Sequence, residues 1–124
     1  QGNADAQFNL GLMYFNGTGV QQDDQTALKW FRLAADQGDA FAQFALGNMY
    51  FMGRGVAKNF VASYALGNLS ASEVPPGFNQ PAQMRDAAAA QLTAEQVEAG
   101  QALTREMRDG KPVKVLDAYL QGAR

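Results

Sequence analysis

Cysteine and histidine are both absent from this chain of 124 residues. Their absence excludes disulfides, thiol nucleophiles, imidazole bases and the usual ligand sets of zinc and haem sites. Most of the familiar catalytic groups are therefore missing. We expect a protein that is not an enzyme and that holds no metal and no cofactor.

Clustered positive charge and long apolar runs are missing as well. The 10 Lys and Arg residues are outnumbered by 12 Asp and Glu residues, and they form no basic patch along the sequence. A protein that binds a phosphate backbone needs such a patch, so we do not expect nucleic acid as a partner. No apolar run reaches the roughly 18 residues that a membrane span requires, so we expect none.

What the chain does contain is typical of a folded protein. Hydrophobic residues make up 47% of the sequence and charged residues 18%, which differs clearly from the composition of disordered chains. The length suits one domain that buries roughly two thirds of the surface of its unfolded form.

A repeat organises the first half of the chain. The stretch "LGLMYFNGTGV" from Leu10 returns as "LGNMYFMGRGV" from Leu46, an offset of 36 residues. At this offset, 14 of the first 20 residue pairs are identical. A period in the mid-thirties is typical of helix-turn-helix solenoids, so the predicted fold class is an all-α, α/α solenoid.

Each unit of the repeat has the pattern of two helices. Gly17 can end the first helix in a left-handed conformation, and Asp23 is a suitable N-cap for a second helix that runs to about Gln37. Asn59 takes the place of Asp23 in the second unit. The apolar positions are Ala6, Leu10, Met13 and Tyr14 in the first helix, and Ala27, Trp30, Phe31, Ala34 and Ala35 in the second.

Gly11 and Gly47 stand inside the predicted first helices, where glycine costs about 1 kcal/mol relative to alanine. Close approach of the bulky Trp30 and Phe31 side chains would offset that cost in the first unit. The second unit has Gly67 where the first has Phe31, which leaves room for another segment. We expect the C-terminal third to pack there.

The positions that differ between the units indicate a candidate binding surface. Four of the six mismatches fall within a narrow arc of the first helix, at about 100° per residue. The second copy of this stripe is more apolar, which favours binding over the alternative, a solvated face that drifts freely. Phe15 and Phe51 are further possible anchors. The candidate partner-binding residues are Asp5, Phe8, Asn9, Leu12, Asn16, Phe41, Phe44, Ala45, Asn48 and Met52.

The first unit closely resembles the Sel1-like repeat, a relative of the tetratricopeptide repeat. The resemblance is carried by its A-x-A-Q, L-G-x-x-Y-x-x-G-x-G-V, A-x-x-W and A-A-x-x-G elements. The second unit matches through Val56 and then departs, with Ser63, Leu66 and Ser70 in place of Ala, Trp and Ala. The resemblance implies a solenoid whose first helices line a concave face.

A loop and capping helices are expected after the repeats. Residues 70–81 hold three prolines and a glycine, which predict a loop, and Pro81 can begin a helix. Thr93 and Gln96 form a capping box for another helix. This stretch resembles the tail of many bacterial Sel1-like proteins. The predicted division is two units at about 3–38 and 39–72, a loop at 73–81, and capping helices at 82–124.

The expected helix in the last stretch, "VKVLDAYLQGA", has apolar residues at helical spacing. We expect it to pack on the other capping helices or to contact a partner. Its apolar positions are Val113, Leu116, Tyr119 and Leu120.

Three other motifs have simple explanations. The acidic pair Asp23–Asp24 is better explained by helix capping than by a cation site or general acid–base chemistry. "GTGV" and "GRGV" lack the preceding strand and the Lys of a phosphate-binding loop, so they are turns. "VPPGF" is interpreted as a bridge between repeat and cap, with a proline-rich docking peptide as the alternative.

The predicted function is a non-enzymatic interaction module, an adaptor or scaffold, that binds a peptide or protein on the concave stripe. The open alternatives are an immunity protein that neutralises a secreted bacterial toxin, a structural spacer and, less favoured, a hydrolase of the Sel1-like type.

Residues 1–3 align with residues 37–39 at the end of a unit. We therefore expect a removed N-terminal segment. The resemblance to bacterial Sel1-like proteins implies a bacterial protein, for which we favour a periplasmic or secreted location over a cytoplasmic one. The oligomeric state is not predicted.

Overall fold

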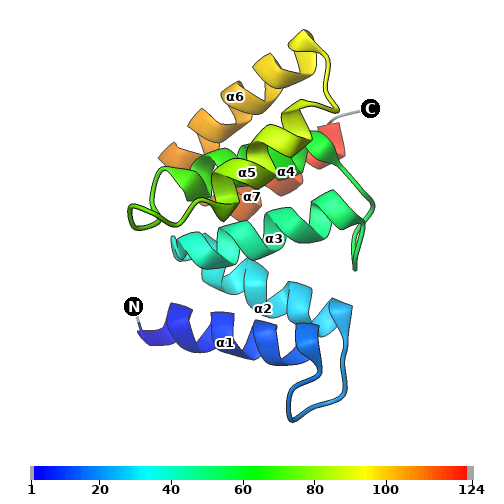
Figure 1. Cartoon of the computed structure of the whole chain (residues 1–124), viewed down its shortest axis with the longest axis vertical. Coiled ribbons are helices and arrows are strands. Elements are labelled where there is room, and N and C mark those ends of the chain that lie inside the picture. The colour runs from blue at the N-terminus through cyan, green and yellow to red at the C-terminus, as the bar shows by residue number, and fades with distance from the viewer. Residues whose placement is uncertain (1, 123–124) are drawn as a thin grey trace.

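The computed structural model describes residues 2–122, which form seven α-helices and no strand. Two helical hairpins stack along the long axis of the molecule, and the C-terminal helices complete its far end (Figure 1). This arrangement confirms the predicted all-α solenoid. The helices are α1 (Gly2–Asn16), α2 (Asp24–Asp36), α3 (Ala40–Met52), α4 (Phe60–Ala71), α5 (Gln80–Ala89), α6 (Ala94–Asp109) and α7 (Pro112–Gly122).

Local signals in the sequence begin and end these helices. The Asp23 carboxylate accepts hydrogen bonds from the backbone N–H groups at the start of α2, and the Asn59 side chain does the same for α4. The predicted capping box of Thr93 and Gln96 is present at the start of α6. Residues 72–79 link α4 to α5, so the loop begins and ends slightly before the predicted bounds of 73–81, and α5 begins at Gln80, one residue ahead of Pro81.

Gly11 allows α2 to lie close against α1. A Cβ atom at Gly11 would lie 2.5 Å from Cε1 of Phe31, which is 1% exposed. The close approach predicted for Phe31 is confirmed, but the same prediction for Trp30 is wrong. Trp30 is only half-buried, and Lys29 Nζ lies 6.0 Å from its ring centroid. One residue along a helix is a rotation of about 100°, so both side chains cannot face the same glycine.

The corresponding space in the second unit is filled from α5. A Cβ atom at Gly47 would lie 2.6 Å from Cε of Met84, and one at Gly67 would lie 3.1 Å from the same atom. Met84 thus takes the place that Phe31 has in the first unit. The prediction that the C-terminal third packs at Gly67 is confirmed.

Helix α6 covers another side of α4. A Cβ atom at Gly100 would lie 2.5 Å from the ring of Tyr64, and the buried Leu103 and Met107 join the core that α4 supplies. As a result most residues of α4 are buried. The C-terminal segment therefore packs along α4 on more than one side.

Helix α7 reaches back to the first unit. Asp36 at the end of α2 accepts a hydrogen bond of 2.7 Å from the backbone N–H of Val113, and Arg32 forms a bidentate ion pair with Asp117. Leu116 is fully buried in the core that also holds the end of α2. The expected packing on α6 is present, and the contact with α2 was not predicted from the sequence.

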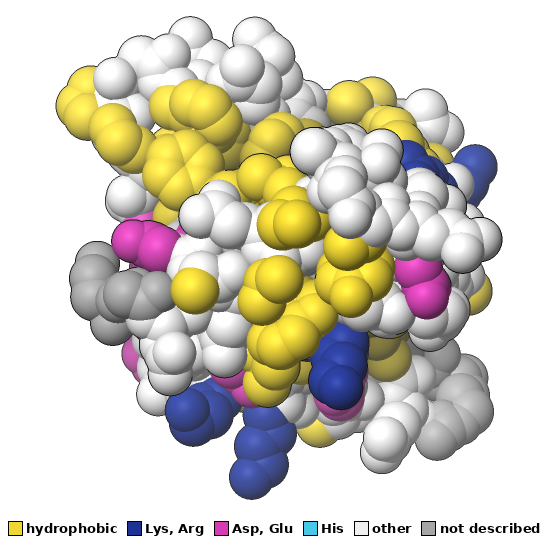
Figure 2. Space-filling model, turned by 90° about the horizontal axis from the view of Figure 1, so that it is seen from below, with side chains coloured by type: hydrophobic (Ala, Val, Ile, Leu, Met, Phe, Trp, Pro, Cys, Tyr) yellow, Lys and Arg dark blue, Asp and Glu magenta, His cyan; other side chains and the backbone are white. Residues whose placement is uncertain are grey.

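The apolar positions predicted for the first helix of each unit are less buried on α1 than on α3. Helix α3 packs against both α2 and α4, whereas among residues 2–122 α1 packs closely with α2 alone. Hydrophobic side chains accordingly gather across the end of the molecule where α1 lies (Figure 2). Ala6 is exposed and Leu10, Met13 and Tyr14 are half-buried, while the identical Ala42, Leu46, Met49 and Tyr50 are buried.

Candidate functional site

A pocket of about 200 Å³ lies between α1 and α3 and is walled mainly by phenyl rings. Helix α2 contributes a ring at its base, and the loop between α4 and α5 contributes another. We call it the aromatic pocket. Its lining residues are Phe8, Leu12, Phe15, Phe31, Phe41, Phe44, Ala45, Asn48 and Phe78.

The six phenyl rings form one connected network. Neighbouring centroids lie between 5.0 and 6.3 Å apart, the separation that is typical of tilted and edge-to-face aromatic pairs. The network joins both repeat units to the loop that follows α4. In order, the contacts are Phe15–Phe31, Phe31–Phe8, Phe8–Phe41, Phe41–Phe78 and Phe78–Phe44.

Six of the ten candidate residues line this pocket. They come from one face of α1 and the equivalent face of α3, because the repeat places the same positions of both helices side by side. The other four lie outside it: Asp5, Asn9 and Asn16 are exposed on α1, and Met52 is 45% exposed at the end of α3. The six are Phe8, Leu12, Phe41, Phe44, Ala45 and Asn48.

Three lining residues were not among those candidates. The sequence indicates Phe15 only as a further anchor, and it predicts that Phe31 packs against Gly11, which it also does. Phe78 was missed altogether. It is the one aromatic residue in the loop of residues 72–79, and an aromatic side chain in a short Pro/Gly-rich loop was the available signal.

Most of the aromatic pocket is accessible from solvent. Phe31 is buried, but the five other rings are only half-buried. Of the two phenylalanines outside the pocket, Phe51 packs edge-on against Phe60 at 5.3 Å. Contiguous apolar surface left open to water marks a binding site more often than isolated apolar residues do.

The chemistry of the lining favours binding over catalysis. None of its nine residues has an ionisable side chain, and Asn48 supplies the one polar side chain among them. General acid–base and nucleophilic chemistry need ionisable or nucleophilic groups, which this pocket does not offer. What it offers is apolar contact and one side-chain amide.

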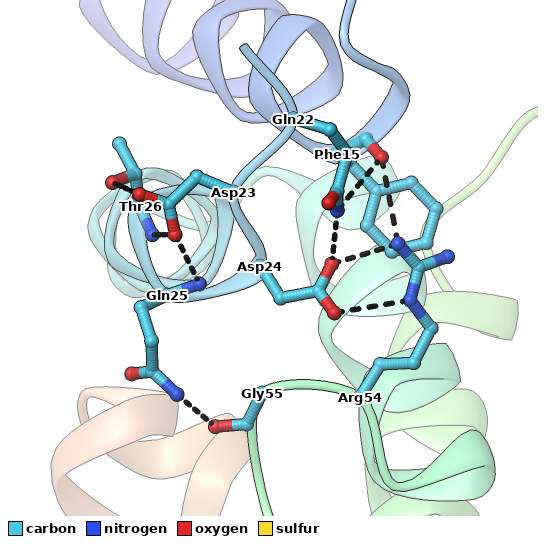
Figure 3. Close-up of polar contacts among 8 residues, drawn as sticks. All are labelled: Phe15, Gln22, Asp23, Asp24, Gln25, Thr26, Arg54 and Gly55. Atoms are coloured by element: carbon cyan, nitrogen blue, oxygen red, sulfur yellow. Dashed lines mark hydrogen bonds and ion pairs between the residues drawn. The ribbon is translucent and has the colours of Figure 1, made fainter.

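An ion pair fixes the two repeat units to one another beside the pocket (Figure 3). Arg54 Nη2 donates a hydrogen bond of 2.7 Å to Asp24 Oδ1, and the guanidinium lies 3.9 Å from the centroid of the Phe15 ring. The hydrogen bonds from Arg54 are the main reason why the pKa of Asp24 lies below its ordinary value. The first unit has Thr18 at the position of Arg54, so its turn has no arginine that could form the same ion pair.

The two acidic residues of the Asp23–Asp24 pair have different roles. Asp23 caps α2 through its own side chain, and hydrogen bonds from Thr26 lower its pKa. Asp24 stands in the first turn and pairs with Arg54.

Across residues 2–122, no group of three or more acidic side chains is placed to hold a metal ion. None of the helices described has the length and apolar character needed to cross a bilayer.

Comparison with known proteins agrees with the repeat architecture. The Sel1 repeat model matches residues 4–39 and 40–73. The structure is similar to that of c5321, a protective antigen present in uropathogenic Escherichia coli strains that displays an SLR fold. The TM-score is 0.82 at 29% identity, over 97% of this chain and 25% of c5321.

A second similar structure is a Sel1 repeat protein from Oxalobacter formigenes. Its TM-score is 0.55 at 30% identity, over 82% of this chain and 90% of that chain. The present chain thus spans a quarter of the length of c5321 and most of the length of the Oxalobacter protein. The sequence matches none of the curated proteins with which it was compared.

Proposed function

Because the chain belongs to the Sel1 repeat family, whose members generally mediate protein–protein interactions, we propose that it binds a peptide or protein segment at the aromatic pocket. Members of the family are typically non-catalytic repeat scaffolds. The proposed role is that of an adaptor or scaffold, in which the rigid packing of α1, α2 and α3 presents a preformed binding surface.

One observation carries this proposal: five half-buried phenyl rings converge on one pocket. Each partly exposed ring costs free energy in water that burial in the core would avoid, at about 25 cal/mol per Å² of apolar surface. A bound partner recovers this free energy by covering the rings. Aromatic residues are also the side chains that most often dominate the energy of protein interfaces.

The position of the pocket agrees with this role. Its walls are two equivalent helices of successive repeats, held at a fixed distance by the packing of Phe31 and by the Arg54–Asp24 ion pair. A surface that is rigid before binding loses little conformational entropy when the partner docks. Most of the conformational entropy that is lost on binding is therefore lost by the partner.

The test is capture of partner proteins by the immobilised chain and by two single variants. Ala45→Glu places a charge in the pocket, while Leu33→Glu places the same charge on α2, where Leu33 is 42% exposed and lies outside the pocket. We expect proteins that wild type and Leu33→Glu both retain and that Ala45→Glu loses. Circular dichroism should show the helix content of both variants unchanged.

The alternative of a structural spacer predicts the opposite pattern. If Ala45→Glu retains every protein that wild type retains, the pocket is not where partners bind, and the proposed function is wrong. If both variants lose the partner equally, binding depends on net charge and not on the aromatic pocket, which also contradicts the proposal.

A further inference from the structure

Membership of the family indicates a protein partner, and the aromatic pocket indicates in addition which kind of side chain that partner inserts. Resting on the function proposed above, we infer that the pocket receives one neutral aromatic side chain, that of Phe, Tyr or Trp, from the bound protein segment. The inference follows from the size of the pocket, the charge of its walls and the way in which the chain's own Phe78 packs there.

The volume suits a single ring. An apolar cavity of about 150 Å³ in another protein holds a benzene molecule, and the aromatic pocket measures about 200 Å³. This space accepts one six-membered ring or an indole. It is too small for the several side chains that a docked amphipathic helix would insert at one point.

The walls exclude a charged group. Asn48 is the one lining residue with a polar side chain, and none of the nine has a charge that could pair with a lysine, arginine or carboxylate of the partner. Placing an unpaired charge in such a pocket carries a large desolvation penalty. The side chain that enters is therefore neutral and mainly apolar.

A pocket of aromatic rings can also bind an organic cation, such as a methylated ammonium group. Two features argue against this ligand. The rings are all phenyl groups, which attract cations less strongly than indole, and the Phe15 ring already carries the Arg54 guanidinium at 3.9 Å. A second cation nearby would be repelled by the first.

The packing of Phe78 shows how an aromatic ring fits this surface. Its ring meets that of Phe41 at 5.0 Å with an interplanar angle of 75°, and that of Phe44 at 6.2 Å with an angle of 89°. Phe78 comes from a loop and is brought to the helices from outside, as a partner's side chain would be. The free space beside it is bounded by rings of the same kind, which can accept another ring edge-on.

The experiment is a titration of the full chain with small probes, followed by the methyl NMR signals of Ala45 and Leu12, which both line the pocket. The probes are N-acetyl-phenylalanine amide, N-acetyl-leucine amide and tetramethylammonium. We expect saturable shifts with the phenylalanine probe, at an affinity about two- to tenfold higher than that of the leucine probe. Tetramethylammonium should cause no saturable shift.

Two variants and one control locate the binding. Ala45→Leu fills the pocket and should abolish the shift at Leu12, while Met52→Ser, on the same helix but outside the pocket, should leave it unchanged. Phe78→Ala enlarges the pocket and should improve binding of N-acetyl-tryptophan amide relative to the phenylalanine probe. This variant keeps the test decisive if Ala45→Leu does not fold.

The inference is overturned if the leucine probe or tetramethylammonium binds as tightly as the phenylalanine probe, or if no probe shifts Ala45 and Leu12. It also fails if the filled and enlarged pockets bind like wild type. Failure of the proposed function has a different signature, since the phenylalanine probe would bind while Ala45→Glu leaves partner capture intact. The opposite result is also distinguishable. If Ala45→Glu abolishes partner capture but the probes show no preference for an aromatic ring, the proposed function holds and the inference about the aromatic side chain is wrong.

Discussion

At the scale of single residues, two equivalent glycines receive different side chains. Gly11 faces the rigid ring of Phe31 from the neighbouring helix of its own unit, whereas Gly47 faces the flexible end of Met84 from α5. The sequence around both glycines is nearly identical. Their surroundings differ because Gly67 replaces the phenylalanine in the second unit.

Substitution of each glycine by alanine should reveal this difference. Alanine gains about 1 kcal/mol of helix propensity at either position. At Gly11 the new methyl group clashes with a ring that cannot yield, and overpacking of this kind costs about 1–3 kcal/mol. At Gly47 the Met84 thioether can move aside, and the remaining contact, with the Leu66 Cβ atom at 3.2 Å, is a much smaller overlap than the one at Gly11. We expect Gly11→Ala to have a lower free energy of unfolding in urea than Gly47→Ala, by about 1 kcal/mol or more.

The matched pair serves as its own control, because both variants make the same chemical change in equivalent helices. Equal stability of the two variants would contradict the account, as would a Gly11→Ala protein that is more stable than wild type.

At the scale of secondary-structure elements, Arg54 links α1, α2 and the turn after α3. It pairs with Asp24 and stacks on Phe15, so it fixes the distance between the two units at the edge of the aromatic pocket. About a third of each charged side chain in the pair is exposed, so solvent screens the interaction and its contribution is modest.

Replacement of Arg54 by alanine should lower the free energy of unfolding by about 1 kcal/mol at pH 7. The folded state lowers the pKa of Asp24, so the ion pair stabilises the protein above the ordinary carboxyl pKa and loses its effect as the pH falls through the lower folded value. The difference between wild type and Arg54→Ala should therefore shrink below about pH 4.

Urea unfolding of both proteins at neutral and acid pH measures this difference. Arg105→Ala removes an exposed arginine from α6 and should show a small, pH-independent effect. An Arg54→Ala deficit that is the same at about pH 3 as at pH 7 would argue against the ion pair as the source of stabilisation.

Helix boundaries could be predicted at this scale because their causes are local. Asp23, Asn59 and Thr93 cap helices through hydrogen bonds to residues two or three positions ahead, and those residues are visible in the sequence. The half-buried state of Trp30 was not visible in this way. It depends on which side chain of α2 takes the place over Gly11, and only the packed pair of helices decides that.

The candidate site could be predicted only in part from the sequence. The repeat aligned the equivalent faces of α1 and α3, which gave six lining residues, including Phe41 and Ala45. Phe78 could not be found from the repeat, since it lies in a loop outside both units and reaches the pocket only through the path of the chain after α4. Its contribution is a tertiary contact without a periodic signal.

At the scale of the whole molecule, α7 makes the fold less modular than a simple solenoid. In repeat proteins each unit usually contacts only its neighbours in sequence. Here the last helix packs against α2 of the first unit, with Leu116 in the shared core and Asp117 paired with Arg32. We therefore expect α7 and the first unit to be coupled in stability.

Leu116→Ala tests this coupling. Truncation of a fully buried leucine costs about 2–5 kcal/mol. Trp30 is the single tryptophan of the chain and lies on α2, so its fluorescence reports on the first unit. We expect the variant to shift the urea midpoint of Trp30 fluorescence as much as that of circular dichroism.

Leu33→Ala, on the exposed side of α2, is the matched control and should change both midpoints little. If the Leu116→Ala variant kept the wild-type midpoint for Trp30 fluorescence while circular dichroism changed, α7 would be independent of the first unit.

The central claim is that partners bind at the aromatic pocket, and site-specific photo-crosslinking tests it most directly. The chain has no cysteine, so Asn9→Cys beside the pocket and Glu106→Cys on α6 each give one attachment point for a benzophenone. We predict that a captured partner crosslinks to residue 9 and not to residue 106, and that Ala45→Glu removes the crosslink. A partner that crosslinks through residue 106 alone, or one that crosslinks to residue 9 regardless of Ala45→Glu, would contradict it.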